Sequence, residues 1–229
     1  SEDKIFNCLN SIDSFCKVII IENSDNKDFK KKLENKYSFV ECFLTGENLG
    51  YANGNNLGLS KVKSEYALIL NPDTTLEKET LYNFLNTAKK FNDFAIIGPA
   101  RQDEYSNIDL YSDKADVFEV DALKGFAMLL NLKQFNEIGF FDSNFFIYLE
   151  EIDLCRRLKE KGKKIYLDKN IKINHVGGSS HNESINFEME LSRNWHWMWS
   201  LFYFNRKHFG YLNSLIKVSK KFISSFINM

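Results

Sequence analysis

The chain contains the stretch Tyr66-Ala67-Leu68-Ile69-Leu70-Asn71-Pro72-Asp73-Thr74, an apolar run that ends abruptly in polar residues. Such a run is typical of a strand buried on both faces, as in a parallel sheet flanked by helices. Pro72 ends ladder hydrogen bonding and leaves Asn71 and Asp73 at the strand's carboxyl end. Ligands bind at this edge of open α/β sheets, and a carboxylate there suits a hard cation such as Mg²⁺ shared with nucleotide phosphates. The alternative is a plain turn, since Asn, Pro and Asp are common turn residues.

Strand and helix patterns alternate on both sides of this stretch. Short apolar runs predict strands over 18–21, 39–44, 66–70 and 94–97, and helical spacing predicts helices over 3–13, 27–36 and 77–91. Further strands are predicted over 117–120, 126–130, 165–167 and 171–175. Alternation through residue 100 argues for an α/β fold with a doubly wound parallel sheet.

The composition is that of an ordinary globular protein, with 44% hydrophobic and 27% charged residues. A length of 229 residues predicts one α/β domain with a C-terminal extension. The net charge of −1 gives no argument for nucleic acid, so no nucleic-acid partner is expected.

Cysteine usage and hydropathy indicate the compartment. The cysteines form no Cys-x-x-Cys pair and lie in or beside apolar runs: Cys8, Cys16, Cys42 and Cys155. We interpret them as buried reduced thiols, not as a zinc site or a disulfide framework. No apolar run approaches the roughly 20 residues needed to span a bilayer, and no signal peptide opens the sequence. We therefore expect a cytoplasmic protein.

Residues 48–58 are rich in glycine and asparagine, with glycines at intervals of four. We predict a loop whose backbone approaches a neighbour closely, followed by a helix toward Val62 whose start can receive an anion. The pattern is neither a Walker nor a Rossmann fingerprint, so it is a weak signal when taken alone.

Carboxylates crowd the first turn of a helix predicted from the spacing of Leu154 and Leu158: Glu150, Glu151 and Asp153. The helix dipole alone favours acidic residues there. The apolar residues 145–149 just upstream would in addition raise the pKa of a carboxylate toward that of a working base. Asp153 and Arg157 are four residues apart, so we expect Asp153 to pair with Arg157 and not to react.

His175 closes the last predicted strand, just before Gly177-Gly178-Ser179-Ser180. A histidine at a strand end is most often structural or solvated. A Gly-Gly-Ser-Ser loop after it, however, would wrap phosphates with backbone N–H groups. The presence of this loop directly after His175 makes His175 a candidate metal ligand.

The tail from residue 191 to 229 contains six Lys or Arg residues and no Asp or Glu. Three tryptophans fall in its first part, and Lys217, Lys220 and Lys221 interleave with apolar residues in its last part. The last part is a basic amphipathic pattern that suits an anionic membrane surface. The alternative is that the tail packs on the domain or dimerises, and for the tryptophan-bearing helix this is as favoured as a membrane surface.

Taken together, these stretches resemble glycosyltransferase family 2, whose members are inverting enzymes of GT-A fold, and within it the rhamnosyltransferase-like branch that builds bacterial surface polysaccharides. The likeness depends on the order and spacing of short motifs along nearly the whole chain: 22–24, 48–58, 70–73, Gly98-Pro99, Gly125, 139–157, 175–180 and 200–210. The resemblance implies a Rossmann-like, mostly parallel sheet flanked by helices over residues 1–185, followed by an aromatic and basic helical tail over residues 186–229.

The resemblance also implies roles for single residues. Asp73 would bind a divalent metal, Mg²⁺ or Mn²⁺, on the donor's diphosphate, with His175 completing the metal shell. Asn71 would face the donor's ribose or sugar. Glu151 would be the general base. The remaining donor-binding residues implied by the motifs are Glu22 near the nucleobase, Asn48 lining the nucleotide pocket, Ser24, Gly125 and Arg157.

The implied activity is metal-dependent, inverting transfer of a sugar, with rhamnose as the expected sugar. The donor would be a dTDP- or UDP-sugar, and the acceptor a hydroxyl of a glycan or lipid-linked glycan on the inner face of the cell membrane, as in O-antigen or capsule synthesis. The alternative is a non-catalytic nucleotide-sugar or glycan-binding partner subunit. A sugar nucleotidylyltransferase is disfavoured, because no Gly-rich loop bearing Arg or Lys follows a first strand.

The sequence departs from the family pattern in three places. Glu151 and Glu22 each stand where the family usually has Asp, which moves each carboxylate out by one methylene. The family's first strand, central in its sheet, has no counterpart before the predicted helix over 3–13. We therefore expect neighbouring strands whose backbone groups lack that partner.

Overall fold

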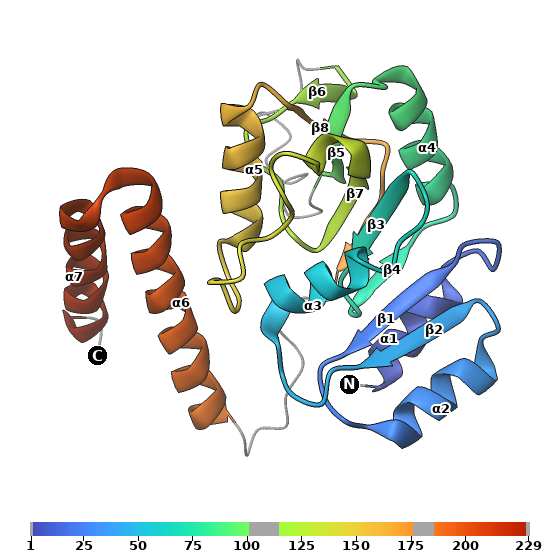
Figure 1. Ribbon diagram of the computed structural model, residues 1–229, viewed down its shortest axis with the longest axis horizontal. Helices are drawn as coiled ribbons and strands as arrows, with labels where there is room; N and C mark the ends of the chain where they lie inside the picture. Colours follow the sequence, from blue (N-terminus) through green and yellow to red (C-terminus); the bar gives the residue numbers. More distant parts are fainter. Residues whose placement is uncertain (1, 101–114, 176–185, 228–229) are drawn as a thin grey trace.

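A computed structural model describes residues 2–100, 115–175 and 186–227 (Figure 1). Its described strands form three sheets. The first is a parallel pair, β1 (Val18–Glu22) and β2 (Val40–Leu44). The second has the order β3 (Tyr66–Leu70), β7 (Ala127–Asn131), β5 (Phe94–Pro99), β8 (Lys164–Asp168) and β6 (Val117–Glu119). The third pairs β4 (Thr74–Leu76) with β9 (Ile173–His175).

The five-stranded sheet is mixed, whereas the alternation of elements had predicted a doubly wound parallel sheet. β7 is antiparallel to both β3 and β5, β6 is antiparallel to β8, and only β5 and β8 pair in parallel. A parallel neighbour requires a long crossover connection, usually a helix. The alternation of strands and helices stops after β5, and the short connection from β6 to β7 holds no described helix. β6 and β7 both run opposite to β5 and β8.

β1 and β3 belong to different sheets. β1 pairs with β2 and β3 pairs with β7, and no ladder joins β1 to β3 within the described residues. The expectation that neighbouring strands lack a partner at the centre of the sheet stays a prediction. Helix α3 (Gly50–Leu59) packs against β1.

Helix α3 occupies most of the stretch 48–58 that was predicted as a loop, so that prediction is wrong. The helix begins at Gly50, whose φ of +74° favours glycine and whose added Cβ would lie 2.3 Å from the carbonyl oxygen of Phe146. Farther along, Gly58 faces the side chain of Ile21 on β1. Intervals of four place the glycines on one helix face, and their lack of side chains lets α3 approach its neighbours closely, as the glycine pattern had indicated.

The core lies on both faces of the five-stranded sheet. Alternate strand residues enter different clusters, so that Ile96 packs with α5 (Glu150–Glu160) and Ile97 packs with α4 (Thr80–Lys90). This double burial explains why these strands are apolar throughout. A third cluster joins the β1–β2 pair to α1 (Glu2–Asn10) and α2 (Lys27–Lys36). All four cysteines are free; Cys8, Cys42 and Cys155 are buried as predicted, whereas Cys16 is only partly buried.

The tail is a helical hairpin, α6 (Asn186–Phe209) and α7 (Tyr211–Ile227), which lies beside α5 in Figure 1. One face of α6 packs on the segment before α5. Ser200 Oγ donates to the carbonyl of Ile147 at 2.8 Å, and the ring of His196 stacks on Phe146 at 4.2 Å. Of the alternatives for the tryptophan-bearing helix, packing on the domain is therefore the one observed for this face.

A buried carboxylate, Asp153 on α5, joins α5 to α6. Its side chain is fully buried, and Oδ2 accepts a hydrogen bond from Arg157 Nε at 2.7 Å. Oδ1 lies 2.7 Å from Lys207 Nζ and 2.8 Å from His208 Nε2, both on α6. The expected pairing of Asp153 with Arg157 is confirmed, and the two α6 partners were not predicted.

We predict that Asp153→Ala lowers the free energy of unfolding by about 3 kcal/mol, because it removes a fully buried carboxylate that joins Arg157 on α5 to Lys207 on α6. Glu160→Ala is the matched control, since Glu160 also pairs at i, i+4 with an arginine on α5, Arg156, but is exposed. That exposed pair should contribute only about 0.3–0.5 kcal/mol. Urea unfolding of both variants measures the difference, and equal losses would contradict a stabilising role for the Asp153 cluster.

Candidate functional site

Asp73 and His175 converge at the end of β3. The β4–β9 ladder places Thr74 opposite His175, and His175 Nε2 lies 3.3 Å from Asp73 Oδ1. The ring of Phe126 stacks on the imidazole, with centroids 4.8 Å apart and planes within 6°. The structure therefore brings together the two residues predicted as metal ligands, although they are about a hundred residues apart in the chain.

The turn at Asn71-Pro72-Asp73 is closed by main-chain hydrogen bonds. The N–H of Asn71 donates to the carbonyl of Phe126 at 2.8 Å, and the carbonyl of Asn71 accepts from Thr74 Oγ1 at 2.7 Å. These bonds use the main chain of Asn71 and not its side-chain amide. The turn holds Asp73 beside β9 and leaves its carboxylate partly exposed.

The donor set at this edge fits a divalent cation that is shared with a substrate. Asp73 offers carboxylate oxygens and His175 an imidazole nitrogen, a combination that Mn²⁺ accepts and that Mg²⁺ accepts less readily. Within the described residues no cluster of three or more His, Cys, Asp or Glu side chains is placed to hold a metal. Phosphate oxygens and water would therefore have to supply the other ligands. Residues 176–180, predicted to wrap phosphates, lie outside the described residues.

Glu151 lies at the start of α5, where three segments of the chain meet. A Cβ added to Gly125 would lie 3.5 Å from Glu151 Cβ and 3.2 Å from the hydroxyl of Tyr51. The same hydroxyl donates to the carbonyl of Gly125 at 2.5 Å. The next residue, Phe126, carries the ring that stacks on His175. Two consecutive residues thus connect the predicted base to the predicted metal ligands.

Burial dominates the electrostatics around Glu151. Burial raises the pKa of the Glu151 carboxyl, and backbone N–H groups at the start of α5 and the charge of Lys124 lower it in part. This direction agrees with the expectation from the apolar residues 145–149. Burial, followed by the charges of Glu150 and Glu151, also raises the pKa of Tyr51. Tyr51 is therefore a neutral phenol that donates to Gly125.

Three predicted donor-binding residues gather where β1 ends and α3 begins. Ser24 Oγ donates to Glu22 Oε1 at 2.6 Å, and Asn48 Oδ1 accepts from the N–H of Gly50 at 3.0 Å. Asn23 connects the two, because its Nδ2 donates to the carbonyl of Gly50 at 3.2 Å. Asn23 Oδ1 is buried and has no hydrogen-bond partner among the described residues. Asn23 was part of a quoted motif, but no role was predicted for it.

Arg157 does not join the other predicted donor-binding residues. Besides its bond to Asp153, its guanidinium donates to the carbonyls of Ile138 at 3.0 Å and Phe140 at 2.5 Å. These bonds fasten the chain segment before α5 to the helix. These contacts indicate a structural role for Arg157, and we do not include it in the proposed donor site.

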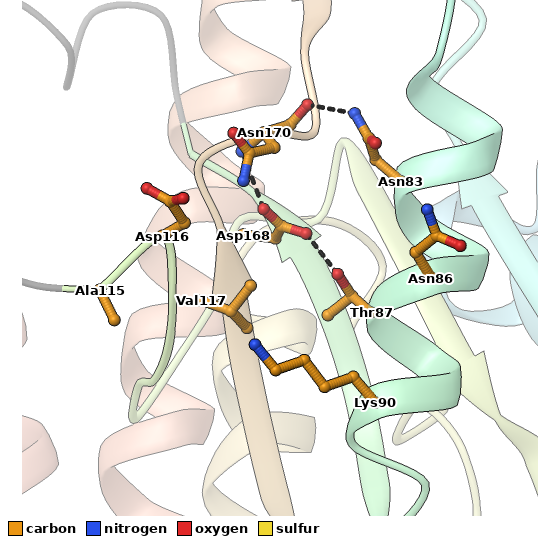
Figure 2. Close-up of a pocket in the computed structure, with 9 residues that line it drawn as sticks. All are labelled: Asn83, Asn86, Thr87, Lys90, Ala115, Asp116, Val117, Asp168 and Asn170. Atoms are coloured by element: carbon orange, nitrogen blue, oxygen red, sulfur yellow. Dashed lines mark hydrogen bonds between the residues drawn. The ribbon is translucent and has the colours of Figure 1, made fainter.

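A separate cavity of about 630 Å³ lies between α4 and the carboxyl end of β8, and none of the predicted site residues lines it (Figure 2). Asp168 is central in its wall. Its carboxylate accepts from Thr87 Oγ1 at 2.5 Å and from the N–H of Asn170 at 2.8 Å. Asn83 Nδ2 donates to the carbonyl of Asn170 at 2.7 Å. The buried carboxylate of Asp168 is thus held by neutral donors, which is consistent with a structural role.

Solved structures of GT-A glycosyltransferases share this fold. A mannosyltransferase from Pyrobaculum calidifontis, in complex with GDP-Man and Mn²⁺, superposes with a TM-score of 0.69 at 11% identity, covering 90% of this chain and 61% of its own. GalNAc-T7 with UDP, GalNAc and Mn²⁺ gives a TM-score of 0.58 at 14% identity, covering 70% of this chain and 37% of its own. These likenesses confirm the predicted GT-A fold class.

Relatives and the family model agree with this assignment. The low-salt glycan biosynthesis hexosyltransferase Agl10 of Haloferax volcanii is 25% identical over 188 residues, which cover 72% of this chain but only 60% of the relative. The rhamnosyltransferase WbbL of Escherichia coli K12 is 25% identical over 237 residues, covering 89% of this chain and 88% of the relative. The model of glycosyl transferase family 2 matches residues 2–157. This chain therefore belongs to glycosyl transferase family 2.

Proposed function

We propose that the chain is an inverting, metal-dependent glycosyltransferase that moves a sugar from a nucleoside diphosphate to a hydroxyl of a glycan acceptor. The observation that carries this proposal is the junction at Gly125 and Phe126. A Cβ on the first would lie 3.5 Å from Glu151 Cβ, and the ring of the second stacks on His175 beside Asp73. Glu151 and the Asp73–His175 pair thus flank residues 125–126. A direct displacement at a sugar linked to phosphate uses a base for the attacking hydroxyl and a metal site for the leaving phosphate.

The reaction is a single displacement. Glu151 accepts the proton of the acceptor hydroxyl as that oxygen bonds to the anomeric carbon and the bond from this carbon to the diphosphate oxygen breaks. Inversion follows from attack on the face opposite the leaving group. Asp73 and His175 would hold the divalent metal, which, when bound, neutralises charge on the departing diphosphate. Glu22, Ser24 and Asn48 would hold the nucleoside.

We propose rhamnose as the sugar and a dTDP- or UDP-sugar as the donor. Support comes from the rhamnosyltransferase that matches nearly the whole chain, and from the nucleotide sugars and nucleotides named in the solved neighbours. The hexosyltransferase relative is named for glycan biosynthesis, which supports a glycan acceptor. A bacterial surface glycan such as O-antigen or capsule is the class of product that we propose.

We further propose that the tail holds the protein on the cytoplasmic face of the cell membrane. The hairpin exposes large apolar side chains, with Trp195 at 69%, Leu212 at 75% and Ile216 at 53% exposure. The exposed Lys217 and Lys220 lie nearby on α7, and the tail carries no acidic residue after position 190. Such a face suits an anionic lipid surface. Among the described helices, none is both long and apolar enough for a membrane crossing.

Calorimetric titration with UDP, dTDP and GDP, each with and without Mn²⁺, tests the donor site. We expect Mn²⁺-dependent binding of UDP or dTDP. Asp73→Ala and His175→Ala should each weaken that binding at least about tenfold, which is about 1.4 kcal/mol. Asp25→Ala, which removes an exposed carboxylate close to β1, should leave it unchanged. Binding that needs no metal would contradict the assigned roles of Asp73 and His175.

Glu151→Gln should lower the transfer rate by about 10²–10⁴-fold, because the amide cannot accept the proton. The measurement is release of nucleoside diphosphate in the presence of Mn²⁺ and lipid-linked acceptors. Glu137→Gln, at an exposed position in the segment before α5, is the control. Full activity of Glu151→Gln would reject Glu151 as the base. Donor binding without turnover in the wild-type protein would favour the alternative, a non-catalytic binding subunit.

Flotation with anionic vesicles tests the membrane proposal. The double variant Leu212→Glu/Ile216→Glu should reduce bound protein at least about tenfold, since each side chain would bury apolar area worth about 1.5–3 kcal/mol. Phe15→Glu is the matched control, because Phe15 is as exposed as Leu212 but lies outside the tail. The proposal would be contradicted if the double variant bound anionic vesicles as well as the wild-type protein does. It would also be contradicted if the wild-type protein bound neutral and anionic vesicles equally.

A further inference from the structure

Glu150 is a buried carboxyl group that the proposed reaction does not use. It is the first residue of α5, and only 5% of its surface is exposed. Its Oε2 is fully buried and has no hydrogen-bond partner among the described residues. A backbone N–H lowers the pKa of this carboxyl in part, but an ionised carboxylate with a buried, unpartnered oxygen is unfavourable, and such a group normally takes up a proton instead.

The neighbouring charges shift the pKa values of Glu150 and Glu151 differently. Burial, and then the neighbouring charge of Glu151, raise the pKa of Glu150 to about 8. Lys124 favours the ionised form of Glu151, whereas no cation lowers the pKa of Glu150 in the same way. Burial and the charge of the pair also raise the pKa of the Tyr51 phenol and of the Cys155 thiol, so both stay neutral. Two carboxyl groups in different environments take different protonation states, as acid–base pairs in active sites do.

The backbone before α5 fixes Glu150 in this position. Tyr148 and Leu149 have φ values of +74° and +65°, a left-handed conformation that costs free energy for residues other than glycine. Contacts from two helices hold the preceding residues in place: the N–H of Tyr51 on α3 donates to the carbonyl of Phe146 at 2.7 Å, and Ser200 on α6 donates to Ile147. The strained turn directs the first residue of α5 into the protein interior and away from solvent.

We propose that Glu150 is a positioning residue that enters the reaction as a neutral carboxylic acid, so that the pair carries one negative charge and that charge lies on Glu151. The inference rests on the proposed role of Glu151 as the base. The proton removed from the acceptor hydroxyl goes to Glu151, and Glu150 keeps its own proton throughout.

The proposal fixes the sign of a pH effect. The proton on Glu150 is present below its raised pKa and is lost as the pH rises through it. Above about pH 8 a second negative charge then appears beside Glu151, and like charges oppose each other and the approach of the anionic donor. The fall of rate on the alkaline side therefore belongs to Glu150. The apparent pKa values of the profile are those of the coupled pair.

The pH dependence of kcat/KM in wild type and Glu150→Gln tests this assignment. The glutamine is neutral at every pH, so the ratio of variant to wild-type kcat/KM should rise by up to about tenfold per pH unit above pH 8, as expected for loss of one titrating group. Glu160→Gln, exposed on the same helix, should give a constant ratio. A pH-independent ratio for Glu150→Gln would overturn the proposal.

Infrared spectroscopy of the full chain without substrates separates this inference from the proposed function. The carbonyl stretch of a protonated carboxylic acid should be present at pH 7, disappear as the pH is raised through about 8, and be absent in Glu150→Gln. This band tests Glu150 even if no sugar transfer is found. Transfer activity without the band would overturn the role of Glu150 and leave the proposed function intact.

Discussion

The close packing at Gly125 is the constraint on which the site depends. A Cβ added to Gly125 would lie 3.2 Å from the hydroxyl of Tyr51 and 3.5 Å from Glu151 Cβ. The chain can pass between α3 and α5 here because glycine has no side chain. The next residue then reaches the other half of the site, where Phe126 accepts from Asn71 and stacks on His175. A bulkier residue at position 125 would push apart groups whose catalytic value depends on placement to within about an ångström.

The parts of this site that follow from local pattern are recognisable in the sequence. β1 and β3, which lead to Glu22 and Asp73, are short apolar runs, and His175 closes a predicted strand. The carboxylates at the start of α5 follow from helical spacing, and the pairing of Asp153 with Arg157 follows from their separation by four. These features depend only on residues that are close in the sequence, so they can be predicted from the sequence alone.

The ladders and contacts that join distant segments were not predicted, although Asp73 and His175 were expected at one metal site. The meeting of Asp73 with His175 requires the β4–β9 ladder, and the direction of β7 is set by its place between β3 and β5. Residues 48–58 are predicted as a loop because glycine and asparagine are poor helix formers. The tight packing of helix α3 against β1 and Phe146 outweighs this low helix propensity. Arg157 carried a motif-based role, but its hydrogen bonds to the segment before α5 are invisible in a one-dimensional pattern.

The ion cluster around Asp153 has a consequence for how the unit of folding is defined. The family match stops at residue 157, at the same arginine that pairs with Asp153, while Lys207 and His208 approach this carboxylate from α6. A boundary drawn by sequence similarity therefore cuts through a single electrostatic assembly. The segment matched by the family model ends before α6, yet α6 supplies two of the groups that pair with Asp153, so the packed unit is larger than the matched segment.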